Sequence, residues 1–261
     1  GSADQYVGYS KINLNRSDPT GSASISVPSG LSINNALKLY FVANLEQNYV
    51  DTGGNSYADW LNNLVGTSDY ATAKTLLKAN LQNSGTGFKA PLLMFGETTK
   101  ASGTKQITIN LTRNVSRVDV WPSLTSGTQL SNFEMECAYL WNVNVKNNIL
   151  DGEMEGPAIL QQPQNKKTVD GVGNIEAKLY AFPNKVLLCE ADDNITTCLI
   201  IGGKYNGQSA TSYYRLNLTA NGSAQEMLAN NRYLIKLKKV NGAGASTPED
   251  AYNSKAGLMD Y

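Results

Sequence analysis

The stretch FEMECAYLWNVNV (133–145) decides the fold, because polar and apolar residues alternate along it. One parity carries the apolar side chains Phe133, Met135, Cys137, Tyr139, Trp141, Val143 and Val145. Ala138 and Leu140 are exceptions on the other parity. Successive side chains of a strand point to opposite faces, so this alternation predicts a long β-strand with one buried face.

The same alternation recurs on both sides of this stretch. It runs from Leu37 to Leu45, through Ile107, Ile109 and Leu111, from Tyr214 to Leu218, and from Tyr233 to Leu237. Segments 176–182 and 196–202 are further strand candidates. Helical signals are confined to an insertion near 56–80, and 223–226 has capping-box spacing for a turn or two at most. Many one-sided strands bury their apolar faces economically by packing sheet on sheet, so we expect an all-β fold of the sandwich type.

The chain is long enough for two cores, and one segment looks like a connection between them. Residues 147–174 are rich in Gly, Pro, Asn and Gln and show no sustained period. We therefore predict two β-sandwich domains, residues 1–150 with the helical insertion and residues 151–261.

Charge and composition exclude several classes of partner. Lys plus Arg and Asp plus Glu number 22 each, so no net field would recruit nucleic acid or anionic lipid. No apolar run approaches the roughly 20 residues that a membrane-spanning helix needs. Gly1-Ser2 resembles an expression remnant, and we expect the natural N-terminus to lie upstream of it.

The chain contains no histidine, which removes the commonest general base and the commonest metal ligand. It also lacks a phosphate-binding loop and a complete dinucleotide fingerprint, so we expect no cofactor and no enzymatic activity. Glu134 and Glu136 imitate a glycosidase pair, but a solvated strand face explains them better. The acidic stretch EADDN (190–194) offers oxygen ligands for calcium, although turn chemistry is the better explanation, and we predict no metal site.

The cysteines and the tyrosines each have two possible roles. Cys189 and Cys198 would face each other across a hairpin if Asp193-Asn194 is its turn, and they would then be placed to form a disulfide. Two small buried residues are the other interpretation, and Cys137 is expected to be a buried thiol. The 14 tyrosines are able to stack on sugars, although those on apolar parities are expected in the core.

Several segments together resemble the major fimbrial subunits (fimbrillins) of the Bacteroidales, the type V pilins. In family order these are KLYFVAN (38–44), PLLMFGE (91–97), INLTRNVSRVDV (109–120), TCLIIGGKY (197–205), YYRLN (213–217), NRYLIKL (231–237), VNGAG (240–244) and TPE (247–249). Each match alone is weak, whereas the ordered set across roughly residues 28–250 is fairly specific.

The resemblance implies two tandem transthyretin-like β-sandwich domains and a cell-surface location. It also implies a lipidated precursor at the outer membrane, proteolytic trimming, and head-to-tail assembly with other pilus subunits by donor-strand exchange. A host protein or a glycan is a further partner that it allows. The alternatives are a surface carbohydrate-binding module and a non-polymerising tip or anchor subunit.

This sequence differs from the fimbrillin family at both of its ends. Family shaft subunits carry a longer N-terminal segment and continue past the Gly-rich tail into donor strands, so we expect either a truncated sequence or a tip or accessory subunit. Arg16, in the loop-like NRSDP (15–19), is a candidate processing site, although an ordinary solvated arginine explains it too. If Arg16 is cleaved, the strand removed would carry Tyr6, Val7, Tyr9, Ile12 and Leu14.

Overall fold

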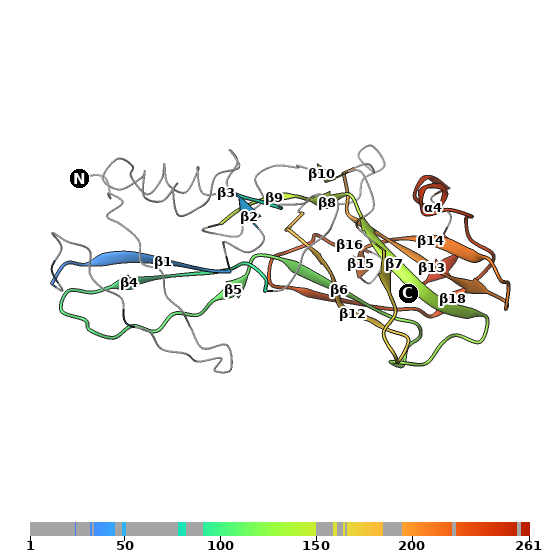
Figure 1. Cartoon of the computed structure of the whole chain (residues 1–261), viewed down its shortest axis with the longest axis horizontal. Helices are drawn as coiled ribbons and strands as arrows, with labels where there is room; N and C mark the ends of the chain where they lie inside the picture. The colour runs from blue at the N-terminus through green and yellow to red at the C-terminus, as the bar shows by residue number, and fades with distance from the viewer. Residues whose placement is uncertain are drawn as a thin grey trace.

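A computed structural model describes residues 24, 32, 34–44, 49–50, 78–81, 91–149, 159–160, 164, 166–184, 195–220, 223–254 and 257–261. Two packed sheets form its larger part, drawn at the right of Figure 1. The first has the order β11 (Lys167–Thr168), β7 (Phe133–Trp141), β13 (Cys198–Tyr205) and β14 (Thr211–Asn217). The second has the order β12 (Ile175–Ala181), β6 (Ser116–Trp121) and β17 (Arg232–Lys236). Buried side chains such as Leu140, Leu199, Val118 and Leu179 form the core, which confirms the all-β prediction.

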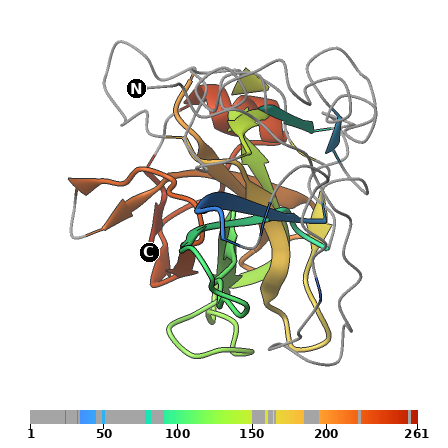
Figure 2. The same ribbon diagram turned by 90° about the vertical axis from the view of Figure 1, so that its left-hand side faces the viewer.

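A second group of strands extends from this sandwich along the long axis of the molecule. It consists of β1 (Leu37–Ala43), β4 (Met94–Lys100) and β5 (Thr112–Arg113), paired antiparallel in that order. Figure 2, viewed from the end that carries β1, shows this ribbon in front of the sandwich. The shorter strands are β2 (Tyr49–Val50), β3 (Lys78–Leu81), β8 (Val143–Asn144), β9 (Lys146–Asn148), β10 (Ile159–Leu160), β15 (Thr219–Ala220), β16 (Ser223–Ala224), β18 (Lys239–Val240) and β19 (Met259–Asp260).

The sheets do not divide at residue 150, where the sequence predicts a domain boundary. β7 precedes that position and pairs with β13, while β6 precedes it and pairs with both β12 and β17. Residues 116–141 therefore belong to one sandwich with the C-terminal half of the chain. The Gly- and Pro-rich composition of 147–174 marks a connection between strands as readily as one between domains. A second, transthyretin-like domain in the N-terminal part stays a prediction.

A β-bulge in β7 changes which of its side chains face the core. The register with β13 shifts at Gly202 and Gly203, where Gly202 opposes Cys137 and Gly203 opposes Met135. The extra residue, Glu136, reverses the parity of the strand beyond it. Phe133 and Met135 therefore face the same core as Ala138 and Leu140, the two exceptions in the sequence pattern.

Beyond the bulge, the other face of β7 is buried as well, which corrects the prediction of a single buried face. Trp141, Cys198 and Ile200 form a second cluster beneath the helix α4 (Pro248–Ser254). The ring of Tyr252 in this helix stacks on Trp141, with centroids 4.7 Å apart and planes at 6°. On its other side the guanidinium of Arg215 lies 4.8 Å from the Tyr252 ring centre.

The sequence did not predict α4, although its start carries a recognisable signal. Thr247 caps the helix through its Oγ1, which accepts from the Asp250 backbone N–H at 3.1 Å and donates to the Asp250 carboxylate at 2.8 Å. Pro248 occupies the first helical position, which suits a residue without an amide proton. The helical insertion predicted near 56–80 lies outside the described residues except at its end, where Lys78–Leu81 forms strand β3 and not helix.

Two further predictions of local structure need correction. The prediction of a short helical turn at residues 223–226 is wrong at its start, because Ser223–Ala224 forms strand β16 and pairs antiparallel with β15. Residues 105–111, read as a strand, alternate between half-buried and exposed side chains as expected. They form no strand, since only Thr112 and Arg113 pair with β4.

Candidate functional site: an arginine-lined cleft

Three arginines from three different strands meet where the β1–β4–β5 ribbon joins the sandwich. Arg113 ends β5, Arg117 lies in β6 and Arg232 begins β17. Because β6 and β17 run parallel, Arg117 and Arg232 are direct partners across the pairing. Like charges in this position repel each other, so the arrangement requires a compensating anion.

Asp119 provides that anion from the same face of β6. Its side chain is completely shielded from solvent and accepts from Arg117 Nε at 2.8 Å and from Arg232 Nε at 2.5 Å. The backbone N–H of Ala177 donates to the same carboxylate at 2.9 Å. Ala177 has a φ of 51°, at an irregularity in the β12–β6 pairing. The hydrogen bond to Asp119 raises the pKa of Arg117 and outweighs the opposing effect of burial, so Arg117 stays charged.

The network continues along the outer face of this sheet. Arg232 Nη2 lies 3.8 Å from Glu176 Oε1, and the same oxygen accepts from Trp121 Nε1 at 2.6 Å. The Lys236 ammonium lies 4.7 Å from the centre of the Trp121 ring. Each charge therefore has a neighbour that fixes its position.

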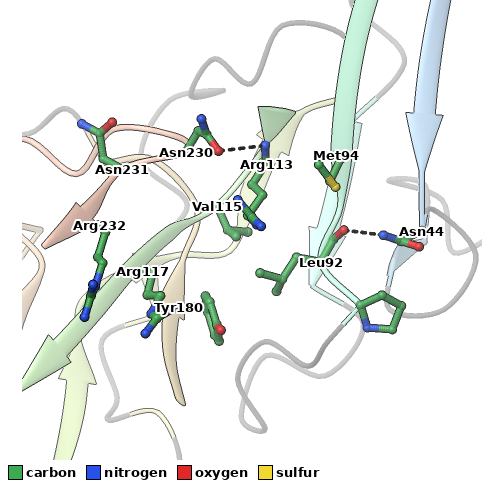
Figure 3. Close-up of a pocket in the computed structure, with 11 residues that line it drawn as sticks. Asn44, Leu92, Met94, Arg113, Val115, Arg117, Tyr180, Asn230, Asn231 and Arg232 are labelled. Carbon is green, nitrogen blue, oxygen red and sulfur yellow. Dashed lines mark hydrogen bonds between the residues drawn. The ribbon is translucent and has the colours of Figure 1, made fainter. Parts of the chain in front are cut away.

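A cleft of about 470 Å³ opens beside these arginines. Its lining residues are Asn44, Pro91, Leu92, Met94, Arg113, Val115, Arg117, Tyr180, Asn230, Asn231 and Arg232, and none of these is acidic. Figure 3 shows Arg113 between two regions of the lining, with Met94 and Leu92 on one side and Arg117, Tyr180 and Arg232 on the other. The cleft thus combines an apolar wall with a basic one.

Two asparagines in the left-handed backbone region hold the walls in place. Asn44, with φ 65°, donates from Nδ2 to the Leu92 carbonyl at 2.7 Å and ties the end of β1 to the strand beside it. Asn230, with φ 58°, accepts the Arg113 backbone N–H on Oδ1 at 3.3 Å and donates its own N–H to the Val115 carbonyl at 3.0 Å. Asparagine tolerates this conformation better than most residues.

Cys198 is the one predicted site residue within the described ranges, and it does not line this cleft. Arg16 and the candidate exchanged strand (Tyr6, Val7, Tyr9, Ile12 and Leu14) lie outside the described residues, as does Cys189. Cys198 is buried in β13, and its disulfide with Cys189 stays a prediction. Burial raises the pKa of the Cys137 thiol, as expected for an inert cysteine. Arg113, Arg117 and Arg232 appear in the segments that resemble fimbrillins, but local sequence gives no sign that β17 pairs with β6.

Of the acidic residues that the sequence singles out, Glu134 and Glu136 lie within the described ranges. Glu136 is held by structural contacts, to Lys204 Nζ at 3.3 Å and to Thr211 Oγ1 at 2.7 Å. Within the described ranges, no group of three or more acidic or cysteine residues is placed to hold a metal ion. The acidic stretch 190–194 lies outside those ranges. The large apolar residues exposed in the described part are Leu124, Val172 and Leu228, and none is aromatic.

No helix in the part of the chain that the structure describes is long and apolar enough to cross a membrane.

No family model matches the sequence, and no curated protein matches it. Among solved structures, a protein from Bacteroides eggerthii provisionally described as a cell adhesion protein is 16% identical, with a TM-score of 0.48 over 85% of this chain and 75% of its own. A fimbrial assembly protein from Parabacteroides distasonis is 14% identical, with a TM-score of 0.41 over 78% of this chain and 65% of its own. Another protein from P. distasonis, provisionally described as a cell adhesion protein, is 15% identical, with a TM-score of 0.44 over 90% of this chain and 86% of its own. Likeness at this level does not assign a function.

Proposed function

We propose that this chain is a structural and adhesive subunit of a bacterial cell-surface fimbria, without catalytic activity, which polymerises by protease-triggered donor-strand exchange. The ordered resemblance to fimbrillins suggests the class. One feature of the structure, the unpaired segment 105–111 (KQITINL), carries the mechanism.

Among the described residues, this segment has the side-chain pattern of a strand but none of a strand's hydrogen bonds. Ile107, Ile109 and Leu111 are half-buried, and the residues between them are exposed. Within the described ranges, no backbone hydrogen bond or strand pairing involves residues 105–111. The segment nevertheless runs close to β4, because the Asn110 carbonyl leaves no room for a Cβ at Gly96.

An extended apolar segment with unpaired N–H and C=O groups is a template for another strand. A strand from a neighbouring subunit would satisfy those groups and cover the half-exposed side chains of Ile107 and Ile109 in one step. Such a contact joins two different surfaces, and it therefore propagates as a filament.

The proposed trigger is cleavage after Arg16, which would release the strand that carries Tyr6, Val7, Tyr9, Ile12 and Leu14. Removal of a strand that competes with the incoming one converts a stable precursor into an assembly-competent subunit. In this proposal the precursor reaches the outer membrane as a lipoprotein, and its partners are other pilus subunits.

The trigger is tested by treating the precursor with an arginine-specific protease and following its mass by size-exclusion chromatography with light scattering. We expect a monomer before treatment, multimers afterwards, and a new N-terminus at Ser17. The Arg16→Gln variant should stay monomeric under the same treatment. Multimers from Arg16→Gln, or a new N-terminus elsewhere, would contradict the proposed trigger.

A second candidate function is a non-polymerising tip subunit or surface module that binds carbohydrate. The arginine-lined cleft favours it, since it offers charged and apolar groups together in one concave site. A protein that remains monomeric after verified cleavage at Arg16 would favour this second function.

A further inference from the structure

We propose that the arginine-lined cleft binds an N-acylated sugar acid, of the sialic acid class, through the sugar's carboxylate. This ligand site goes beyond the proposed role in polymerisation and does not depend on it. Three features of the described residues favour such a ligand: the free guanidinium of Arg113, the fixed positions of Arg117 and Arg232, and the chemistry of the two walls.

Arg113 lines the cleft with a guanidinium that is available to a ligand. It is exposed, and within the described residues its guanidinium makes no hydrogen bond or ion pair. Its backbone, by contrast, is fixed through Asn230. Arg113 therefore contributes a positive charge to the cleft that no described acidic residue neutralises.

Arg117 and Arg232 are held in position before any ligand binds. Asp119 engages each of them through Nε, which fixes the orientation of both guanidinium planes. Within the described part of the chain, the bonds to Asp119 leave their terminal nitrogens available to other acceptors, apart from the 3.8 Å contact of Arg232 Nη2 with Glu176 Oε1. Holding the donors in place before binding lowers the entropic cost of capturing a ligand. Guanidinium groups match the planar geometry of a carboxylate.

The walls of the cleft select the rest of the ligand. Leu92, Met94 and Val115 offer an apolar surface that suits the methyl group of an acyl substituent. The amides of Asn230 and Asn231 and the half-buried Tyr180 suit sugar hydroxyls. The volume of about 470 Å³ lies within the range typical of small-ligand sites. Inorganic phosphate would use the arginines but not the apolar wall.

Binding is measured on the uncleaved monomer by calorimetry and saturation-transfer NMR. The probes are N-acetylneuraminic acid, its neutral relative N-acetylmannosamine, glucuronic acid, which lacks the acyl group, and a sialylated trisaccharide. We expect saturable binding of the first and the last, weaker binding of glucuronic acid, and none of N-acetylmannosamine. The trisaccharide tests whether the cleft also binds the sugar acid at the end of a glycan chain. If the trisaccharide does not bind, the ligand is the free sugar acid.

The decisive variant is Arg113→Gln, which we expect to weaken binding about tenfold or more, corresponding to the loss of a charge-assisted contact. Its matched control is Lys105→Gln, an exposed cation outside the cleft, which should bind as the unaltered protein does. Equal binding by Arg113→Gln, equal binding of the neutral sugar, equal binding of glucuronic acid, or no saturable binding at all would overturn the proposal. None of these results bears on polymerisation, because the monomer is used throughout.

Discussion

Asp119 neutralises two arginines that the parallel pairing of β6 and β17 places side by side. Its side chain is completely shielded, and three donors converge on its two oxygens. Removing the charge from Asp119 would leave Arg117 and Arg232 facing each other without compensation.

We therefore predict that Asp119→Asn lowers the free energy of unfolding by about 2–4 kcal/mol, as urea denaturation would measure. The control is Glu97→Gln, at a pair in which Lys38 and Glu97 are 3.6 Å apart and their side chains are 43% and 49% exposed. An exposed pair of this kind contributes little, and its loss should change stability by less than about 1 kcal/mol. Similar effects of the two substitutions would show that the Asp119 network is not structural.

At the scale of elements, the docking of α4 depends on a single aromatic side chain. Tyr252 lies between the Trp141 ring and the Arg215 guanidinium, and its hydroxyl accepts from Asn142 Nδ2 at 2.9 Å. The Tyr252 carbonyl also accepts from Arg215 Nη1 at 2.8 Å. The ring therefore links the helix to both β7 and β14.

Tyr252→Ala should lower the free energy of unfolding by about 3 kcal/mol, because it removes a packed aromatic ring. Tyr252→Phe keeps the ring and loses only the hydroxyl contact, so we expect a loss of about 1 kcal/mol. Thermal and urea denaturation would measure both. Equal losses for the two variants would mean that the hydroxyl contact, and not the stacked ring, holds α4 in place.

Most strands could be predicted from alternation, whereas the features that disturb alternation could not. The strands around Leu39, Tyr139, Leu216 and Ile235 lie where the pattern places them, because side-chain direction follows from backbone geometry alone. The bulge at Glu136 depends on β13, where Gly202 and Gly203 have no room for a Cβ. A partner more than sixty residues away leaves no trace in the local pattern around Glu136.

In the whole molecule, pairings between segments that are distant in sequence determine which strands form the sandwich and which residues line the cleft. The boundary predicted at residue 150 stays a prediction, although β6 and β7, which precede it, pair with strands that follow it. The arginine-lined cleft was missed because Arg117 and Arg232 become neighbours only through the pairing of β6 with β17. Composition and local pattern are blind to such contacts.

A proline substitution within residues 105–111 tests whether this segment receives a strand from a neighbouring subunit. Thr108→Pro removes one backbone donor from 105–111, where the described residues provide it with no acceptor. The monomer should keep its stability, while assembly after cleavage should be blocked. The control is Ser102→Pro in the turn closed by the Thr104 N–H and the Ala101 carbonyl, in which Gly103 has φ 74°. Proline suits that turn position, so Ser102→Pro should assemble normally.

The measurement that tests donor-strand exchange most directly is residue-resolved amide hydrogen exchange of 105–111 in the cleaved polymer and in the uncleaved monomer. If a neighbouring subunit adds a strand there, alternate amides of this segment exchange rapidly in the monomer and become protected by orders of magnitude in the polymer. Equal exchange of residues 105–111 in a verified polymer would contradict the account, because the subunits would then be joined elsewhere.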